Sequence, residues 1–278
     1  MTPDEIGRLV ESACLLEVSA PKPGNVSRQN DFADVSFEDF LLSAVAIRPV
    51  LARAGETAVG AMILGAVEET RRVVGSNTNL GIVLLLAPLA RAAARGGGTL
   101  RDRLREVLGA LTVDDARDAC AAIRLAAPGG LGSAESQDVR EEPSLPLRDV
   151  MALAAERDTI AREYVTDYDV TFSLTAPVLR KARAEKRAWP VAVLDAYLRT
   201  LAEVPDTLIA RKEGVGAARA VSQRAGQVLA GGEAGSLERA RAAEAFDREL
   251  RGSGNRMNPG TTADLVAAAL FVALAEEL

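Results

Sequence analysis

The sequence predicts an all-α fold, a compact globular domain of about a dozen helices. Apolar residues recur at helical spacing along most of the chain, and several of these segments open on a Ser or Thr with an acidic residue three positions later. No part of the sequence shows sustained strand alternation bounded by hairpin turns, and the nearest, residues 164–172, fits a junction between helices better. Because 48% of the residues are hydrophobic and only 4% are aromatic, Leu, Val, Ile and Ala must fill the core, which suits close-packed helices.

The first helix is expected over residues 3–19. Thr2 supplies an N-cap, Pro3 occupies the first helical position, and Glu5 completes a capping box. The same pair of cap and acid recurs at three later helix starts: Ser36 with Asp39, Thr99 with Asp102, and Thr112 with Asp115. In the first half of the chain we therefore expect further helices over residues 37–54, 57–74, 79–95, 100–110 and 113–126.

Residues 127–146 form the longest stretch without a helical pattern. Loops of this length inside compact domains usually serve function or remain disordered, so the stretch is either a polar lid or a flexible crossover. After it we expect helices over residues 147–165, 168–186, 190–202, 205–213, 215–230, 237–251 and 261–277. No repeat of fixed period divides the chain, so we expect a single domain over residues 1–278.

Composition excludes several classes of function. A net charge of −6 argues against a nucleic-acid or anionic-membrane partner, because both bind to basic protein surfaces. The chain has no histidine, which excludes a Ser-His-Asp triad and a His-ligated zinc. Cys14 and Cys120 lack metal-ligand spacing and are expected to be buried thiols in a reducing compartment. Catalysis must therefore use carboxylates, cations, amides, Tyr or a carboxylate-bound metal.

The sequence shows no sign of a secretory or membrane-spanning segment. The first residues lack the features of a signal peptide. The apolar run 265–275 is about half the length that a membrane span needs, and the run 82–94 contains Pro88 and Arg91. We therefore expect a soluble cytoplasmic protein that works without a membrane, and we leave homo-oligomerisation open.

Three short motifs rich in Pro, Gly and Asn lie where helical patterns end or begin. They cover residues 21–26, 75–81 and 255–265. Each places small polar groups and free backbone amides at a helix terminus, where the dipole favours an anion such as phosphate. Any one of them could be an ordinary helix cap, but three together predict a composite binding site.

The motifs supply the candidate binding residues. Lys22, one of only four lysines in the chain, is stiffened by Pro21 and Pro23, and Gly24 lets the backbone turn, so its ammonium could hold a phosphate. The alternative is an exposed loop lysine. The complete set of candidate nucleotide-binding residues is Lys22, Gly24, Asn25, Asn77, Thr78, Asn79, Asn258, Gly260 and Thr261.

Carboxylates near these motifs are the candidates for chemistry. Asp264 lies a few positions into the last helix, where it could ligate a metal or merely complement the helix dipole. Asp158 could face the site, or form an ordinary surface pair with Arg162 four residues later. Together with Glu135, these side chains could hold Mg²⁺, a hard ion that prefers oxygen ligands and substrate phosphates.

In this order the motifs resemble the triphosphoribosyl-dephospho-CoA synthase family. The resemblance covers most of the chain and is most specific at its two ends. It rests on Glu17 followed by Pro21-Lys22-Pro23-Gly24, on Asn77-Thr78 with Gly81, on Asp158-Thr159, and on Asn258-Pro259-Gly260 with Ala263-Asp264-Leu265.

The resemblance implies an all-α glycosyl transferase. A ribose hydroxyl of 3′-dephospho-CoA would attack C1 of the ATP ribose, and adenine would leave. Mg²⁺ and Lys22 would neutralise the triphosphate. Asp158 or Glu135 would be the catalytic carboxylate, and Asp34 and Asp264 would bind the metal.

The second motif departs from the family, which typically reads Asn-Thr-His-Lys-Gly where this chain has Asn77-Thr78-Asn79-Leu80-Gly81. The chain therefore resembles a divergent branch of the kind found in archaea and methylotrophs, with dephospho-CoA or a related acceptor. Two other functions stay open: an Mg²⁺-dependent nucleoside or ADP-ribose hydrolase, and a non-catalytic helical nucleotide-binding protein.

Overall fold

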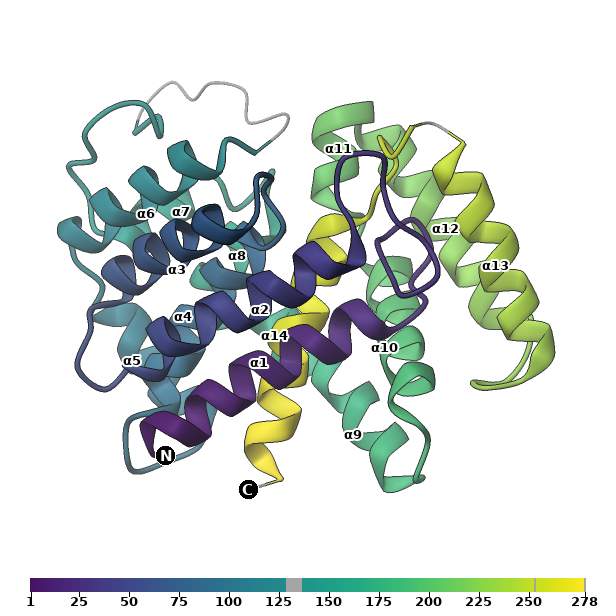
Figure 1. Cartoon of the computed structure of the whole chain (residues 1–278), viewed down its shortest axis with the longest axis horizontal. Coiled ribbons are helices and arrows are strands. Elements are labelled where there is room, and N and C mark those ends of the chain that lie inside the picture. The colour runs from purple at the N-terminus through teal and green to yellow at the C-terminus, as the bar shows by residue number, and fades with distance from the viewer. Residues whose placement is uncertain (129–136, 253, 278) are drawn as a thin grey trace.

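A computed structural model describes residues 1–128, 137–252 and 254–277, and Figure 1 shows the path of the chain. Over these residues the secondary structure consists of fourteen α-helices and one π-helix, with no β-strand. The predicted all-α class is confirmed.

The first six helices lie close to their predicted positions. The four predicted capping boxes all form, with Thr2, Ser36, Thr99 and Thr112 each accepting a hydrogen bond from the backbone of the acidic residue three positions later. The helices are α1 (Pro3–Ser19), α2 (Phe37–Ala52), α3 (Val59–Val73), α4 (Leu80–Ala93), α5 (Leu100–Gly109) and α6 (Val113–Ala126).

The second half of the chain contains more breaks than the sequence pattern predicts. Its elements are α7 (Leu147–Ala152), α8 (Thr159–Val165), the π-helix η1 (Val170–Thr175), α9 (Ala176–Ala184), α10 (Trp189–Glu203), α11 (Thr207–Glu213), α12 (Val215–Ala230), α13 (Leu237–Arg251) and α14 (Gly260–Glu276).

The predicted helix over residues 147–165 is wrong, because the chain breaks between α7 and α8. The carboxylate of Asp158 accepts hydrogen bonds from the amides of Ile160 and Ala161 and so starts a new helix. This break turns Asp158 away from the predicted surface pair with Arg162 and puts it at a helix terminus.

The predicted helix over residues 168–186 begins as η1 for a related reason. The buried carboxylate of Glu163 accepts hydrogen bonds from the amides of Val170 and Thr171 and from the Thr171 hydroxyl. Glu163 thus holds the first amides of η1, a single π-helical turn that runs directly into α9. Burial raises the pKa of Glu163, which these hydrogen bonds partly offset.

Helix α14 is the central element of the fold. It packs against α1, α4, α9, α10, α11 and η1, with helices on both sides of it in Figure 1. A helix that is apolar on all sides is stable only when it is surrounded, and α14 and α4 are buried over most of their length. Within the described residues no helix is long and apolar enough to cross a membrane.

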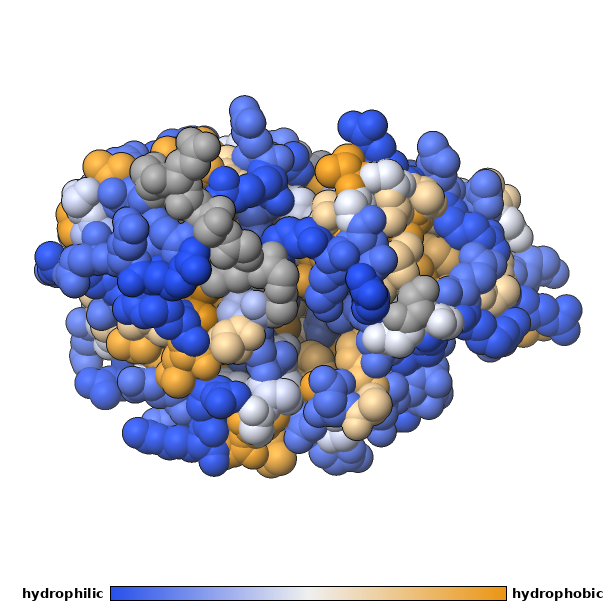
Figure 2. All heavy atoms as spheres, turned by 90° about the horizontal axis from the view of Figure 1, so that it is seen from above, coloured by the Kyte–Doolittle hydropathy of each residue, from blue (hydrophilic) through white to orange (hydrophobic). Residues whose placement is uncertain are grey.

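The arrangement brings several helix N-termini to one side of the molecule. Figure 2 looks onto this side and shows a mostly hydrophilic surface with a hollow near its centre. The starts of α4, α8 and α14, which come from distant parts of the sequence, all line the cavity below this surface.

Candidate active site

A cavity of about 620 Å³ lies where α4, α8 and α14 begin. Its volume is within the range of about 300–1,000 Å³ that small-molecule sites occupy. Most of the predicted site residues line it, although they come from distant parts of the sequence. These residues are Asn25, Asp34, Asn77, Thr78, Asn79, Asp158, Asn258, Gly260, Thr261 and Asp264.

Two of the helices that start at the cavity have no side-chain cap. The side chain of Asn79 at the start of α4 accepts no hydrogen bond from its own helix, and Pro259 at the start of α14 has no side-chain acceptor. Among the described residues, the amides of Gly81, Ile82 and Thr261 have no acceptor. Such free amides at a helix N-terminus favour an anionic ligand.

The side chains of the second motif mostly shape the loop before α4. Asn77 accepts a hydrogen bond from the amide of Leu80 at 3.1 Å. The hydroxyl of Thr78 lies 2.6 Å from that of Ser43, and the amide of Asn79 donates to Thr70 at 3.0 Å. Asn77 alone of the three is exposed, so it is the most accessible of them to a ligand.

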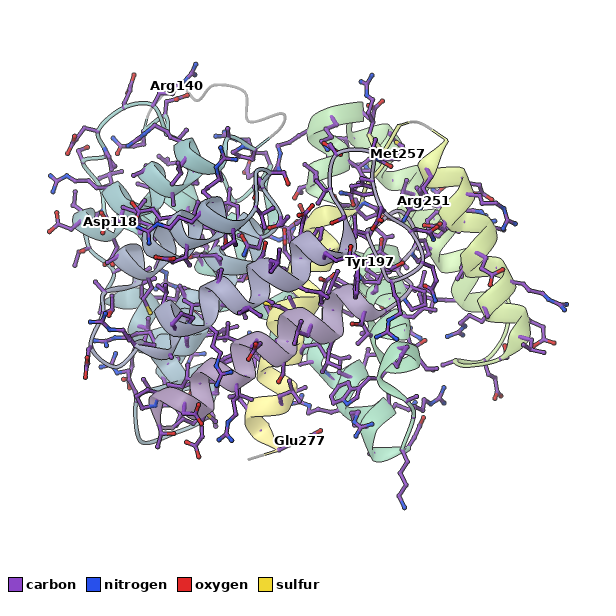
Figure 3. All side chains as sticks on the ribbon, viewed as in Figure 1. Asp118, Arg140, Tyr197, Arg251, Met257 and Glu277 are labelled. Carbon is purple, nitrogen blue, oxygen red and sulfur yellow. The ribbon has the colours of Figure 1, made fainter. Side chains whose placement is uncertain are left out.

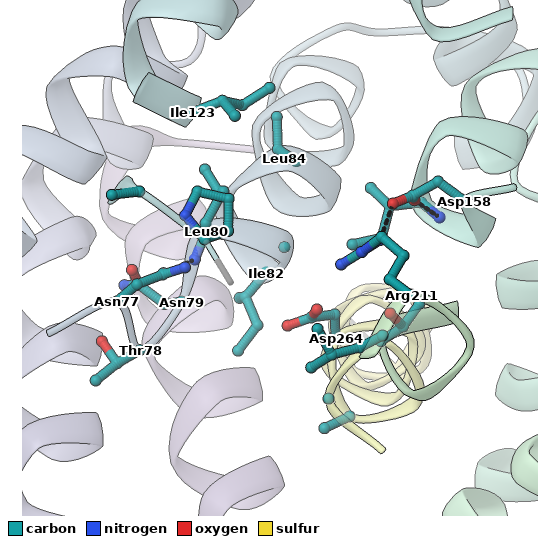
Figure 4. Close-up of a pocket in the computed structure, with 18 of the residues that line it drawn as sticks. Asn77, Thr78, Asn79, Leu80, Ile82, Leu84, Ile123, Asp158, Arg211 and Asp264 are labelled. Carbon is teal, nitrogen blue, oxygen red and sulfur yellow. Dashed lines mark hydrogen bonds and ion pairs between the residues drawn. The ribbon is translucent and has the colours of Figure 1, made fainter. Parts of the chain in front are cut away.

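Asp264 and Gly81 connect the second and third motifs. A Cβ atom on Gly81 would lie only 2.0 Å from Asp264 Oδ2 and 2.8 Å from Ile160 Cδ1. The carboxylate therefore occupies the space that any other residue at position 81 would fill. Figure 4 shows Asp264 in the space between the α4 side chains and Arg211.

Asp264 is the carboxylate most suited to chemistry. Its side chain is enclosed by the protein yet reached from the cavity, and it makes no hydrogen bond to any described residue. Burial raises the pKa of Asp264 well above its usual value, and the nearby charges of Glu17, Asp206 and Asp158 raise it further. Such an environment favours the protonated carboxyl, which can act as a general acid.

Asp158 is not placed to act as the predicted catalytic base. Its Oδ1 accepts the two amide hydrogen bonds that start α8, and its Oδ2 forms an ion pair with Arg211. With both oxygens engaged, Asp158 acts instead by holding Arg211 against the cavity wall, as the dashed line in Figure 4 shows. The other predicted catalytic residue, Glu135, lies outside the described residues.

The cavity has cations that were not among the predicted site residues. Arg157, Arg211, Lys212 and Arg256 all line it. Lys212 has no hydrogen-bond or ion-pair partner among the described residues, and its burial, together with the charge of Arg211, lowers its pKa. A half-buried ammonium without a counter-ion is well suited to pair with a phosphate.

The prediction that Lys22 contacts phosphate is wrong in this structure. Its side chain is 0% exposed, does not line the cavity, and its ammonium lies 2.9 Å from the Glu17 carboxylate. The ammonium also donates to the backbone carbonyls of Glu17 and Ala20. Because a buried charge must be paired, Lys22 neutralises Glu17, whose carboxylate does line the cavity.

Gly24 also lies outside the cavity and has a structural role. Its φ of +77° and its contact with Leu250 and Pro259 exclude a side chain, since a Cβ would lie 2.8 Å from Leu250. Its amide donates to Asp247 at 2.7 Å. The predicted binding role of Gly24 is therefore replaced by that of a tight packing point between the first and third motifs.

Asn25 faces the cavity but is already engaged. Its amide donates to the Tyr197 hydroxyl at 2.9 Å and to the carbonyl of Pro259 at 3.5 Å, and Arg251 donates to its carbonyl. Tyr197 and Arg251 come from α10 and α13 and approach the loop after α1 (Figure 3). These contacts fix the loop that forms one cavity wall.

The cavity residues could hold Mg²⁺ only together with a phosphate ligand that supplies further oxygen atoms. Among the described residues, no three acidic or cysteine side chains come together as a metal-binding group. Asp34 is exposed at the cavity, whereas the raised pKa of Asp264 favours a protonated form that does not ligate cations. Since Mg²⁺ is commonly held by one or two carboxylates plus substrate phosphates, Asp34 suits such a site better than Asp264 does.

One signal in the sequence could have found Lys212. The scarcity of lysine, which drew attention to Lys22, applies equally to Lys212. Lys212 also follows Pro205-Asp206-Thr207, which opens α11 much as the three motifs open other helices. Asp206 links α11 to α14, because it also accepts hydrogen bonds from the amide and hydroxyl of Thr262.

Comparison with known proteins relates this chain to one family. A family model described as ATP:dephospho-CoA triphosphoribosyl transferase matches residues 3–278. A crystal structure from Archaeoglobus fulgidus, whose title describes a candidate triphosphoribosyl-dephospho-CoA synthase, superimposes with a TM-score of 0.68 and 28% identity. It covers 85% of this chain and 98% of that chain.

Two curated proteins show similarity of different extent. A 2-(5″-triphosphoribosyl)-3′-dephosphocoenzyme-A synthase of Klebsiella pneumoniae is 26% identical over an alignment of 278 positions, gaps included. The alignment covers 94% of this chain and 91% of that protein. A protein of Pseudomonas syringae pv. syringae (strain B728a), named as a probable synthase of the same kind, is 35% identical over 96 residues. That match spans 34% of this chain and only 32% of the Pseudomonas protein.

Proposed function

The chain belongs to the family of ATP:dephospho-CoA triphosphoribosyl transferases, and from this premise we propose that its cavity transfers the 5-triphosphoribosyl group of ATP to 3′-dephospho-CoA or a related acceptor. Adenine is the second product. The partners of the protein are then small nucleotides, which suits a cavity of this size in a chain with a net charge of −6.

The observation that carries the proposal is the position of Asp264. This enclosed carboxyl, which has no hydrogen-bond partner in the described part of the chain, lies in the same cavity as Lys212, Arg211 and the starts of α4 and α14, which lack a side-chain cap. A glycosyl transfer from a nucleoside triphosphate needs both features, namely cations and amides for the phosphates and a carboxyl group beside the sugar.

The proposed reaction exchanges one bond at C1 of the ATP ribose for another. The bond from C1 to the adenine nitrogen breaks, and adenine leaves with the bonding electrons and takes a proton from the Asp264 carboxyl. The resulting carboxylate faces the positive charge on the sugar. The acceptor hydroxyl oxygen then bonds to C1, and its proton returns to Asp264.

The other residues of the cavity hold the triphosphate away from the reacting bond. Lys212 and Arg211 pair with phosphate oxygens, and Asp158 keeps Arg211 in place. The free amides of α4 and α14 donate to the same anion. Mg²⁺ would reduce the charge of the triphosphate when bound, with Asp34 as the protein carboxylate nearest to solvent.

The test is to measure free adenine after incubation with ATP and Mg²⁺, with and without dephospho-CoA. Adenine that appears only with dephospho-CoA, together with a new nucleotide of the summed mass, supports the proposal. Adenine released without any acceptor would instead indicate a hydrolase. ATP binding without adenine release under either condition would indicate a different acceptor or a binding protein.

A further inference from the structure

The lining of the cavity beyond Gly81 includes a group of apolar side chains on α4, α6 and α7, and Asp138 lies near one of them, Cys120. We name this group the apolar arm. It is formed by α4, α6 and α7 through Leu84, Cys120, Ile123, Leu147, Val150 and Met151. Figure 4 shows Leu84 and Ile123 close together at one end of the cavity, away from the pair of Asp158 and Arg211.

The apolar arm begins next to Asp264. Ile160 Cδ1 lies against Gly81 in the same place as the Asp264 carboxylate, and Ile160 also lines the cavity. Leu84 is one helical turn beyond Gly81 on α4, and its carbonyl is fixed by the hydroxyl of Tyr164 at 2.6 Å. A group bonded to a sugar carbon beside Asp264 would therefore meet the start of the arm.

The chemistry of the arm suits a flat aromatic ring. Aliphatic side chains from three helices line it, and two of the six sulfur-containing residues of the chain, Cys120 and Met151, are among them. Sulfur makes favourable contacts with aromatic rings. Burial raises the pKa of the Cys120 thiol, which keeps this side chain neutral.

Another group of lining residues differs from the arm. It includes two phenylalanines, Phe32 and Phe40, together with the exposed Asp34. Arg251 already covers the Phe32 ring, 5.5 Å from its centroid. This part therefore suits the entry of a second, partly solvated molecule.

We propose that the apolar arm binds the purine base of the donor nucleotide and holds the adenine as it leaves. The inference rests on the proposed function, because it takes Asp264 as the group beside the reacting sugar carbon. The arm would place the base on one side of Asp264, and the cations Arg211 and Lys212 would hold the triphosphate on another. Contacts with Leu84, Ile123, Val150 and Met151 would then favour a flat aromatic ring at this place.

Filling the arm tests this proposal. Ile123→Trp and Val150→Trp fill it from α6 and α7, and both positions are only partly buried, so the fold has room to adjust. Leu125→Trp is the matched control, because Leu125 is on α6 two residues away, is 38% exposed and does not line the cavity. Phe40→Ala probes the lining that includes Phe32 and Asp34.

Binding is measured by titration calorimetry with adenine, ATP, inorganic tripolyphosphate and dephospho-CoA. We expect Ile123→Trp and Val150→Trp to weaken adenine and ATP binding at least tenfold and to leave tripolyphosphate binding unchanged. Leu125→Trp and Phe40→Ala should bind adenine like the unmodified chain. Intact adenine binding in both filled variants, or its loss in Phe40→Ala, would overturn the assignment of the arm.

The result also separates this inference from the proposed function. If the filled variants lose dephospho-CoA binding but retain ATP and adenine binding, the arm belongs to the acceptor and only the inference fails. If the unmodified chain binds neither ATP nor adenine, the proposed function fails and the inference fails with it.

Discussion

Replacing Gly81 by Ala tests whether the position of the Asp264 carboxylate matters to the reaction. The new Cβ would start 2.0 Å from Asp264 Oδ2, and ordinary contact begins at 3.4 Å, so the carboxylate must move by about 1.4 Å. Overpacking of this kind lowers the free energy of unfolding by about 1–3 kcal/mol. The better helix propensity of Ala restores at most about 1 kcal/mol of it.

The expected loss of activity is larger than the loss of stability. A displacement of about 1 Å in a catalytic group can reduce a rate by about 10²-fold. We therefore expect Gly81→Ala to release adenine at least about 10²-fold more slowly, while its Tm falls by only a few degrees, at about 2–4 °C for each kcal/mol.

The matched control is Gly226→Ala in α12, where a Cβ meets nothing within 4 Å. This change should stabilise the chain by about 0.5–1 kcal/mol and leave adenine release unchanged. The assays are thermal unfolding and chromatography of adenine at saturating substrates. If Gly81→Ala matched Gly226→Ala in both assays, the placement of Asp264 against Gly81 would have no role in the reaction.

Three further predictions concern the charges around the cavity. Lys22→Met should destabilise the chain by about 3–5 kcal/mol in denaturant unfolding, because it leaves the Glu17 carboxylate buried and unpaired, and adding Glu17→Gln should recover part of that loss. Lys212→Ala should weaken ATP binding about tenfold or more in calorimetry. The control is Lys181→Ala, which removes an exposed lysine outside the cavity and should leave ATP binding unchanged. Equal effects of the two substitutions would refute the phosphate-binding role of Lys212. The folded chain keeps a proton on Asp264 that the unfolded chain releases above about pH 3.9, so the free energy of unfolding should fall as pH rises from there through the raised pKa of Asp264. In Asp264→Asn the Tm should therefore vary less with pH. Equal dependence of Tm on pH in the two chains would contradict the raised pKa.

Local rules of helix formation predicted most of the fold. Capping boxes depend on residues only three positions apart, so the starts of α1, α2, α5 and α6 could be found from the sequence. The same rules failed where a side chain captures distant backbone or starts an unexpected helix. Glu163 accepts hydrogen bonds from amides seven and eight residues later, and Asp158 starts α8 as a local N-cap while its other oxygen pairs with the distant Arg211.

The motifs located the cavity but not the role of each residue. Helix termini rich in Gly and Asn indicated where chain segments could meet, and two of the three do bring free amides to the cavity. Lys22 was misjudged because its partner Glu17, five residues earlier, faces it only once α1 ends and the chain turns. Lys212 and Arg211 were missed because they lie at the end of α11, and only the folding of α11 against α14 brings them to Asp264.

The most direct test of the account compares ATP binding and adenine release in Asp264→Asn. Asn has nearly the same shape and cannot exchange the proton, so the cations should still hold the nucleotide. We predict ATP affinity within about threefold of the unmodified chain and adenine release reduced by about 10²–10⁴-fold in the presence of dephospho-CoA. Adenine release at the unmodified rate would contradict the central claim that Asp264 is the reacting carboxyl group.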